Sequence, residues 1–342
     1  MDFLTLFAIY GIVVLGCIFL MCTYTSQVET SLGRLGDFFT KVSSLFLPEW
    51  LQTTLRGAFH RLFHQQNRLF VALHFMLEAA VYGEFTFEVF GYCREMGFGI
   101  NGLLWPYWLF AVKTYFFYRC STKDPGTISR SNHGQLVQVY PYDGLMFREA
   151  TSCPTCEFVK PARSKHCWIC NRCVHRFDHH CVWVNNCIGA LNLKYFLAYL
   201  VTLTAAVASV TLLTGGLLLQ AVLSSDLINA TYIDNSGLTH PVGLFFIIQH
   251  LFLTFPRIVF MLGFLIFLFL LLVGYTFFHF YLSLSNKTSN EWYKLRSLLL
   301  CHRRHNSQGK NHITQQNIYF KGLVANLKEI FQPINTSEKK TR

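Results

Sequence analysis

Seven cysteines and four histidines lie between residues 153 and 187 of this 342-residue chain, and these side chains are common protein ligands of zinc. The group begins with Cys153 and Cys156 and continues with His166 and Cys167. Cysteine pairs with two residues between them, mixed with histidines, are typical of metal binding in a reducing compartment rather than of disulfides. Two tetrahedral zinc sites take eight ligands, so at least three of these side chains would remain free.

Cys181 is the thiol that we expect to react, because it directly follows Asp178, His179 and His180. The thiolate is the reactive form of cysteine, and an unperturbed thiol with a pKa of about 8.5 is only a few per cent ionised at pH 7. One histidine could hold zinc while the other acts as a base that Asp178 orients. The spacing alone does not say which histidine has which role.

The chain around this segment has the composition of a membrane protein. Hydrophobic residues make up 52% of it and charged residues only 14%, against about 25% charged residues in soluble domains. We therefore expect an all-α polytopic membrane protein with about five transmembrane helices, at residues 3–23, 69–88, 98–118, 195–221 and 257–282.

Ionisable residues fall near the middle of the second expected span and toward one end of the third. His74, Glu78 and Glu84 interrupt the second span, and we expect Lys113 in the third to snorkel toward the nearer interface. Residues 242–255 are apolar but short, so we expect an interfacial or re-entrant segment there.

Lysine and arginine are unevenly distributed between the connecting segments, which predicts the orientation of the chain. Residues 24–68, 119–194 and 283–342 carry five, ten and eleven of them, whereas residues 222–256 carry none. By the positive-inside rule, the first three segments lie in the cytosol and the N-terminus lies in the lumen. The glycosylation sequon at Asn229 then falls in the lumenal loop. Because the net charge of +11 is spread over three segments, nucleic-acid binding loses its support.

The expected spans divide the chain into six parts, which we list in order. They are an extra N-terminal transmembrane helix (1–23), a cytosolic loop with an amphipathic helix (24–68), spans two and three (69–118), a cytosolic cysteine-rich domain (119–194), spans four and five with the lumenal loop (195–282), and a cytosolic tail (283–342). The amphipathic helix could lie on the membrane or pack on the protein itself.

The segment from Cys153 to Phe196 strongly resembles the cysteine-rich domain of the DHHC family of protein S-palmitoyltransferases. The family pattern C-x2-C-x9-H-C-x2-C-x2-C-x4-D-H-H-C-x5-C-x4-N-x3-F matches at every position. The resemblance extends to Asp124-Pro125-Gly126, to Thr288-Ser289-Asn290-Glu291, and to a tail motif around Asn326. The chain departs from the family in Ser289, where a second threonine is usual, and in an extra N-terminal span beyond the usual four.

The resemblance implies two structural zinc sites and a catalytic group. One zinc would bind Cys153, Cys156, His166 and Cys173, and the other would bind Cys167, Cys170, His180 and Cys187. His179 would be the base, Asp178 would orient it, and Cys181 would be the acylated nucleophile. His175 is left as an ordinary polar residue. The implied donor is acyl-CoA such as palmitoyl-CoA, the acceptors are membrane-associated proteins with cytosolic cysteines, and the zinc-built loop would hold Cys181 at the bilayer surface.

Other residues carry weaker expectations. Aromatic side chains that could line the acyl chain are Phe116, Phe117, Tyr195, Phe196 and Tyr199, and cations that could meet the phosphates of CoA are Lys160, Arg163, Lys165 and Lys194. The apolar positions of 323–331 predict a helix that docks on the catalytic loop. Lys339 and Lys340 resemble a di-lysine signal, which predicts the endoplasmic reticulum membrane, with the Golgi as the alternative. The competing functions are a zinc module that only recruits partners and a transporter built on His74 and Glu78.

Overall fold

The computed structural model describes residues 48–51, 53, 54, 57, 61, 65–233, 237–305 and 317–333. The chain divides into two units, residues 1–67 and 68–342. The first expected span and most of the amphipathic helix lie outside the described residues, although Glu49, Trp50 and Leu51 are helical. The second unit holds both the helices and the cysteine-rich segment.

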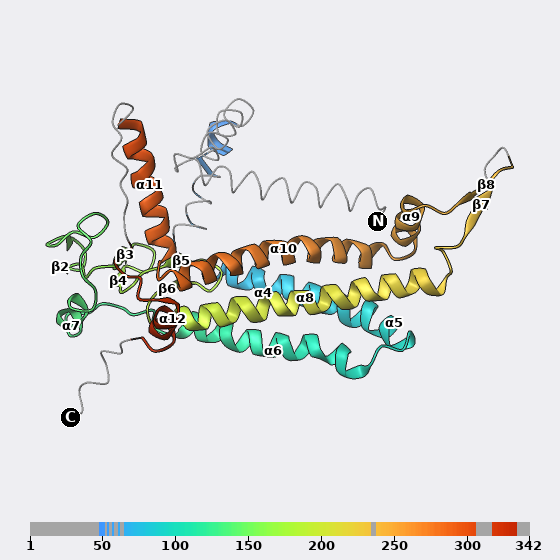
Figure 1. Ribbon diagram of the computed structural model, residues 1–342, viewed down its shortest axis with the longest axis horizontal. Coiled ribbons are helices and arrows are strands. Elements are labelled where there is room, and N and C mark those ends of the chain that lie inside the picture. Colours follow the sequence, from blue (N-terminus) through green and yellow to red (C-terminus); the bar gives the residue numbers. More distant parts are fainter. Residues whose placement is uncertain are drawn as a thin grey trace. The chain divides into compact units, whose positions relative to one another are not determined.

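Long helices lie side by side in the second unit (Figure 1). Helix α4 (Leu69–Glu84) continues without a break through a π-helical turn, η1 (Phe85–Val89), into α5 (Phe90–Glu95). Helix α6 covers Ile100–Thr122, α8 covers Leu193–Ser224 and α10 covers Pro256–Leu284. Both α6 and α10 pack along α8, which places α8 at the centre of the bundle.

Three helices in the described part of the chain are long and apolar enough to cross a membrane: Leu69–Glu95, Leu193–Ser224 and Pro256–Leu284. They correspond to the second, fourth and fifth expected spans. Helix α6 occupies the place of the third and is 23 residues long, but it is less apolar and is not among the three. Three candidate spans are therefore found within the helical architecture that the sequence predicts.

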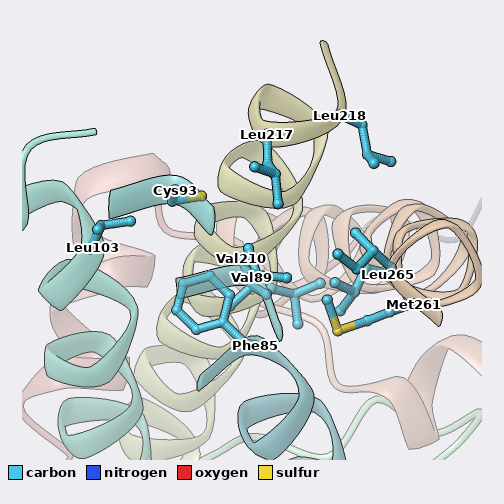
Figure 2. Close-up of a cluster of buried hydrophobic side chains, with 11 residues drawn as sticks. Phe85, Val89, Cys93, Leu103, Val210, Leu217, Leu218, Met261 and Leu265 are labelled. Atoms are coloured by element: carbon cyan, nitrogen blue, oxygen red, sulfur yellow. The ribbon is translucent and has the colours of Figure 1, made fainter. Parts of the chain in front are cut away.

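A cluster of buried apolar side chains joins these helices (Figure 2). Phe85, Val89 and Cys93 follow one another at intervals of four residues, so they lie on one face of the helix that runs through η1 into α5. Against that face pack Leu103 of α6, side chains of α8 such as Val210, and side chains of α10, namely Ile258, Met261 and Leu265.

Lys113 does not snorkel, and that prediction was wrong. Its side chain is 1% exposed and forms an ion pair with Glu78 of α4. Glu78 also lies 3.2 Å from His74 Nε2, one turn earlier in the same helix. An isolated charge inside a helix bundle is costly, and a partner of opposite charge at this depth reduces that cost.

The cysteine-rich segment consists of three short antiparallel hairpins. They are β1 (Ser152–Cys153) with β2 (Phe158–Val159), β3 (Lys165–Cys167) with β4 (Arg172–Val174), and β5 (His179–Cys181) with β6 (Asn186–Ile188). The first cysteines of the hairpins, Cys153, Cys167 and Cys181, are fourteen residues apart. Each turn contains a residue of positive φ, at Glu157, Asn171 and Asn185. The three hairpins are thus copies of one turn geometry.

The remaining elements lie at the two ends of the helices. The hairpin of β7 (Thr231–Ile233) and β8 (Thr239–Pro241) and the helix α9 (Leu244–Thr254) lie at the end far from the cysteine-rich hairpins (Figure 1). At 11 residues, α9 is too short to span a bilayer. Helices α7 (His133–Val137), α11 (Ser289–His305) and α12 (Leu323–Phe331) lie at the end of the cysteine-rich hairpins.

Candidate active site and metal centres

Two groups of four side chains have the composition and spacing of zinc sites. The ligand atoms of Cys153, Cys156, His166 and Cys173 all lie within 4.8 Å of one another, as do those of Cys167, Cys170, His180 and Cys187. The Nδ1 atom of His166 lies 3.4 to 3.7 Å from its three cysteine sulfurs. In a tetrahedron with Zn–S of about 2.3 Å and Zn–N of about 2.0–2.1 Å, that separation is about 3.5 Å. The donor sets therefore fit zinc.

The hairpin register brings the ligands together. His166 pairs with Cys173 across β3 and β4, and His180 pairs with Cys187 across β5 and β6. In both cases the preceding hairpin supplies two further cysteines, one from the end of its first strand and one from its turn, so each metal group joins two neighbouring hairpins. The strands are only two or three residues long, and bound zinc would be the main link between them.

Strand geometry separates the two adjacent histidines. Successive side chains of a strand point to opposite faces, so in β5 His179 and Cys181 share one face and His180 points to the other. Accordingly, the Nδ1 atom of His180 lies 3.3 Å from the sulfur of Cys170, whereas the Nδ1 atom of His179 lies 2.7 Å from Oδ2 of Asp178. His180 therefore points into the second group of cysteines, whereas His179 lies beside Asp178 on the same face of β5 as Cys181.

Asp178 is buried, and several donors hold its carboxylate. Its Oδ2 faces His179, and its Oδ1 accepts a hydrogen bond of 2.7 Å from the backbone N–H of Ser289. The Ser289 hydroxyl donates to the backbone carbonyl of Asp178 at 3.1 Å. Burial alone would raise the pKa of Asp178, but the interactions with His179, His279 and the Ser289 N–H lower it below its usual range. Asp178 is therefore a carboxylate at neutral pH.

The thiol of Cys181 lies in an environment that favours its ionised form. Burial would raise its pKa, but His179 and the backbone groups of Val184 and Trp183 lower it below the ordinary value. Burial would lower the pKa of His179, yet Asp178 and Cys181 raise it to about 10. Among the described residues, the buried Nε2 atom of His179 has no hydrogen-bond partner. This nitrogen can therefore exchange a proton with a reacting group, while Nδ1 is fixed by Asp178.

Apolar side chains of α6 and α8 surround Cys181. It belongs to a buried cluster with Phe117, Phe196 and Tyr199, and Phe116 and Tyr195 pack against that cluster. All five aromatic residues expected to lie near the acyl chain thus belong to, or pack against, the cluster that contains Cys181. The ring of Phe196 also meets that of His179 edge-on, with centroids 5.2 Å apart. Cys181 lies where the helices meet the cysteine-rich hairpins.

The segment Thr288–Glu291 caps helix α11 and touches the carboxylate of Asp178. The Thr288 hydroxyl accepts a hydrogen bond from the Glu291 N–H, and the Glu291 carboxylate accepts one from the Thr288 N–H. This reciprocal pair is a capping box. Ser289, which stands where the family usually has threonine, makes both contacts to Asp178. The motif therefore fixes the start of α11 and the position of Asp178 together.

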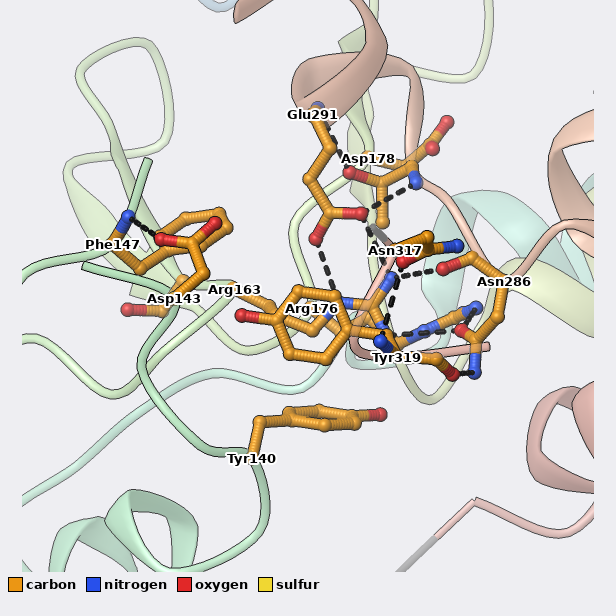
Figure 3. Close-up of polar contacts among 12 residues, drawn as sticks. Tyr140, Asp143, Phe147, Arg163, Arg176, Asp178, Asn286, Glu291, Asn317 and Tyr319 are labelled. Carbon is orange, nitrogen blue, oxygen red and sulfur yellow. Dashed lines mark hydrogen bonds and ion pairs between the residues drawn. The ribbon is translucent and has the colours of Figure 1, made fainter. Parts of the chain in front are cut away.

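Arg163 does not face solvent, and the expectation that it meets CoA phosphates was wrong. It is fully buried, and it donates to the carboxylate of Glu291 and to the side-chain and backbone oxygens of Asn286 (Figure 3). Arg176, also buried, donates to the same Asn286 side chain. His175 is buried too, with its ring stacked on Tyr140 at 5.3 Å. These residues hold the hairpins to the start of α11.

The tail docks on this region as a helix, as expected, with the apolar Ile330 buried in the cluster that contains Cys181 and the polar Asn326 buried beside it. Asn326 and Ile330 are buried in α12, whereas Leu323 and Phe331 are more than half exposed. The Asn326 side chain donates to the carbonyl of Leu284 at the end of α10. Asn335 and the pair Lys339–Lys340 lie outside the described residues.

Three buried residues of this region are not predicted from the sequence as part of the site: Arg176, Asn286 and His279. Arg176 and Asn286 have positive φ, which no composition signal reveals. His279 of α10 lies with Nδ1 4.0 Å from Oδ2 of Asp178. The signal that could have marked His279 is its isolation, since it is an ionisable residue within an apolar helix.

Comparisons with known proteins agree with this site. Residues 146–296 match the model of the DHHC palmitoyltransferase domain. The protein named palmitoyltransferase ZDHHC4 from Mus musculus is 47% identical over 346 residues, covering 99% of both chains, and that from Rattus norvegicus is 45% identical over the full length of both. Palmitoyltransferase SWF1 of Yarrowia lipolytica is 44% identical over 101 residues, 28% of this chain and 26% of its own.

The extra N-terminal apolar stretch and the tail resemble the mammalian family member numbered four. The relatives that align over nearly the whole chain bear this name. With one matched domain and relatives aligned over nearly all of its length, the chain belongs to the DHHC palmitoyltransferase family.

Proposed function

We propose that this protein is a protein-cysteine S-palmitoyltransferase that works through an acyl-enzyme on Cys181. It takes a long-chain acyl group from acyl-CoA and passes it to cysteines of substrate proteins. The observation that carries the proposal is that the eight metal-type ligands gather in two groups, while Cys181 stays outside both and interacts with His179, whose Nδ1 atom is bound to Asp178. A thiol that binds no metal and lies next to an oriented imidazole can act as a nucleophile.

The first step forms a bond between Cys181 and the acyl carbon. The Cys181 thiolate attacks the thioester carbonyl, the bond to the CoA sulfur breaks, and the departing CoA thiolate takes the proton held on Nε2 of His179. In the second step, a substrate cysteine gives its proton to His179 and attacks the acyl-enzyme, and Cys181 leaves as a thiolate. One thioester replaces another in each step, so no oxidant or further energy source is required.

The two metal groups would serve the structure of the site. Six cysteines and two histidines would hold two zinc ions, which supply the charge that lets six thiolates lie close together and which link the hairpins. Neither group contains Cys181, and the residues that move protons are Asp178 and His179.

The apolar surroundings of Cys181 suit an acyl chain at the edge of a bilayer. Each CH₂ group of the chain gains about 0.8 kcal/mol when it is buried in an apolar environment. The side chains of α6 and α8 around Cys181 provide such an environment. We infer that α6 also spans the membrane, beside the three candidate spans, and that the N-terminal stretch adds a fifth. The hairpins and the tail would then face the cytosol of a multi-pass protein, with the N-terminus in the lumen of the endoplasmic reticulum.

Intact-mass analysis of the purified full-length protein after incubation with palmitoyl-CoA tests the proposal directly. We expect one acyl group, labile to hydroxylamine, and two zinc ions in the same sample. The variant Cys181→Ser should keep both zinc ions and lose both the acyl-enzyme and the transfer to protein. Acyl transfer at the wild-type rate by this variant would show that Cys181 is not the nucleophile. Failure of the wild-type protein to pass its acyl group to any protein would instead favour a zinc module that only recruits partners.

The division of roles between histidines is tested by a pair of variants. His166→Ala should lose zinc and unfold the hairpins, because it removes a ligand. His179→Ala should keep both zinc ions and fail to form the acyl-enzyme, because only the base is lost. Equal loss of zinc in the two variants would show that His179 is not the base.

A further inference from the structure

His279 is an imidazole buried on a helix that is otherwise apolar. It lies in α10, within the sequence TFFHFYLSL, and is 3% exposed. Its ring meets those of Tyr275 and Phe196 edge-on, with centroids 4.6 and 5.0 Å away. A polar ring in such a setting is costly unless a polar group faces it, so the surroundings of its nitrogen atoms are decisive.

The polar group that His279 faces is the catalytic carboxylate. Its Nδ1 atom lies 4.0 Å from Oδ2 of Asp178, and its ring centroid lies 5.7 Å from that of His179. Phe196 contacts both imidazoles, since its centroid lies 5.2 Å from that of His179. His279, Phe196 and His179 therefore form a cluster of three rings with Asp178 at its side.

The two oxygens of Asp178 are held from different directions. The Ser289 N–H binds Oδ1, His179 binds Oδ2, and His279 approaches Oδ2 from helix α10. His279 and Ser289 are close in sequence, at the end of α10 and the start of α11. One segment at the end of the last described span thus supplies two groups that confine the carboxylate. A distance of 4.0 Å is longer than a hydrogen bond, and contacts of this kind often shorten when substrate binds.

We propose that His279 is a positioning residue for the acyl transfer, which acts by keeping Asp178 aimed at His179. Its N–H donates toward Oδ2 of Asp178 from helix α10 when the acyl-CoA complex forms. During both steps the proton on Nε2 of His179 is gained and lost, and a carboxylate held on both oxygens keeps the imidazole in one orientation. The inference rests on the proposed function, because it assigns His279 to the same reaction.

Three variants of the full-length protein separate positioning from packing. His279→Phe keeps an aromatic ring against Phe196 and Tyr275 but has no nitrogen, His279→Gln keeps an N–H donor, and His279→Ala has neither. We expect single-turnover acylation of Cys181 by palmitoyl-CoA to slow in His279→Phe and His279→Ala alike, by on the order of tenfold to a hundredfold. His279→Gln should retain most of the rate. In all three, the acyl-CoA concentration for half-maximal rate and the two zinc ions should be unchanged.

Two further variants serve as controls for this experiment. Phe277→Leu, at a side chain on α10 that is 71% exposed, serves as the matched control and should acylate at the wild-type rate. A His279→Phe variant that also acylates at that rate would overturn the inference, because packing alone would then explain the residue. Slow acylation by His279→Gln equal to that of His279→Phe would overturn it as well. Cys181→Ser run in parallel tests the proposed function by itself, since only acylation of that variant would contradict the acyl-enzyme.

Discussion

Charged side chains are buried in matched sets in this protein. Lys113 of α6 pairs with Glu78 of α4, and Arg163 and Arg176 lie among the carboxylates of Glu291 and Glu329. In each set the positive and negative charges are equal in number. Since an uncompensated buried charge costs several kcal/mol, loss of one member should be worse than loss of a whole pair.

The pair in the helix bundle gives a direct test of this rule. Lys113→Met should lower the stability of the protein by about 3 kcal/mol or more, because it leaves Glu78 without its cation. The double variant Lys113→Met/Glu78→Leu should regain most of that loss. Thermal unfolding of the single and double variants in detergent, analysed as a double-mutant cycle, measures the coupling. Additive losses would show that the two charges act independently.

At this scale, the sequence was informative for the cysteine-rich segment and misleading for buried charges. The metal-type ligands and the nucleophile follow from a long pattern confined to 44 residues, Cys153 to Phe196, so no distant contact is needed to recognise them. From the sequence, Lys113 is instead expected to snorkel to the interface and Arg163 to meet the phosphates of CoA. Their partners lie 35 and 128 residues away, and a charge looks solvated until the fold supplies such a partner.

Hairpins and helix ends, rather than long strands, position the reactive groups. The third hairpin repeats the geometry of the other two, but its turn has Val184 where they have Cys156 and Cys170. Cys181 therefore occupies the place of a metal ligand in a hairpin that lacks the second cysteine of the pair. This explains how a thiol can share the rigid setting of the metal groups and remain free.

The packing of the third hairpin depends on Gly189, just after β6. A Cβ atom at Gly189 would lie 2.6 Å from the carbonyl oxygen of Pro125 and 2.6 Å from a methyl group of Val174. Gly189→Ala should therefore destabilise the hairpin by about 1–3 kcal/mol and slow acylation of Cys181. Gly134→Ala is the matched control, because nothing lies within 4 Å of a Cβ there. The test measures the free energy of unfolding and the rate of Cys181 acylation in both variants. Equal values for the two variants would refute this account.

The sequence predicts a helix well where its own residues determine it. It predicts poorly which side chains are buried where several elements pack together. Helices α8 and α10 extend the expected spans 195–221 and 257–282 by only a few residues, because a long apolar run determines a helix locally. The tail helix was expected too, but the burial of its polar Asn326 was not. Asn326 is buried because it bonds to the end of α10, 42 residues earlier, and an amphipathic pattern of leucines cannot reveal that contact.

On the scale of the whole molecule, the long helices and the cysteine-rich hairpins are stabilised in different ways. The helices bury apolar side chains against one another and satisfy their own backbone hydrogen bonds, so they need no ligand. The hairpins have strands of two or three residues and small clusters of buried apolar groups, such as Ile128, Leu136, Cys153 and Cys173. Short hairpins of this kind are marginal in water without a further link between them. The catalytic end should therefore depend on metal, whereas the helical end should not.

Removal of zinc by a strong chelator tests this division with a readout that does not involve activity. In hydrogen exchange measured by mass spectrometry, peptides from residues 152–188 should lose protection, because the ligand thiolates would repel one another without the metal. Peptides from Leu193–Ser224 and Pro256–Leu284 should keep their protection. The tail helix Leu323–Phe331 should follow the hairpins, since Glu329 and Lys321 form ion pairs and hydrogen bonds in the network around Arg163 and Asn286. Loss of protection throughout the helices, or none in the hairpins, would show that metal binding and helix packing are not separable in this protein.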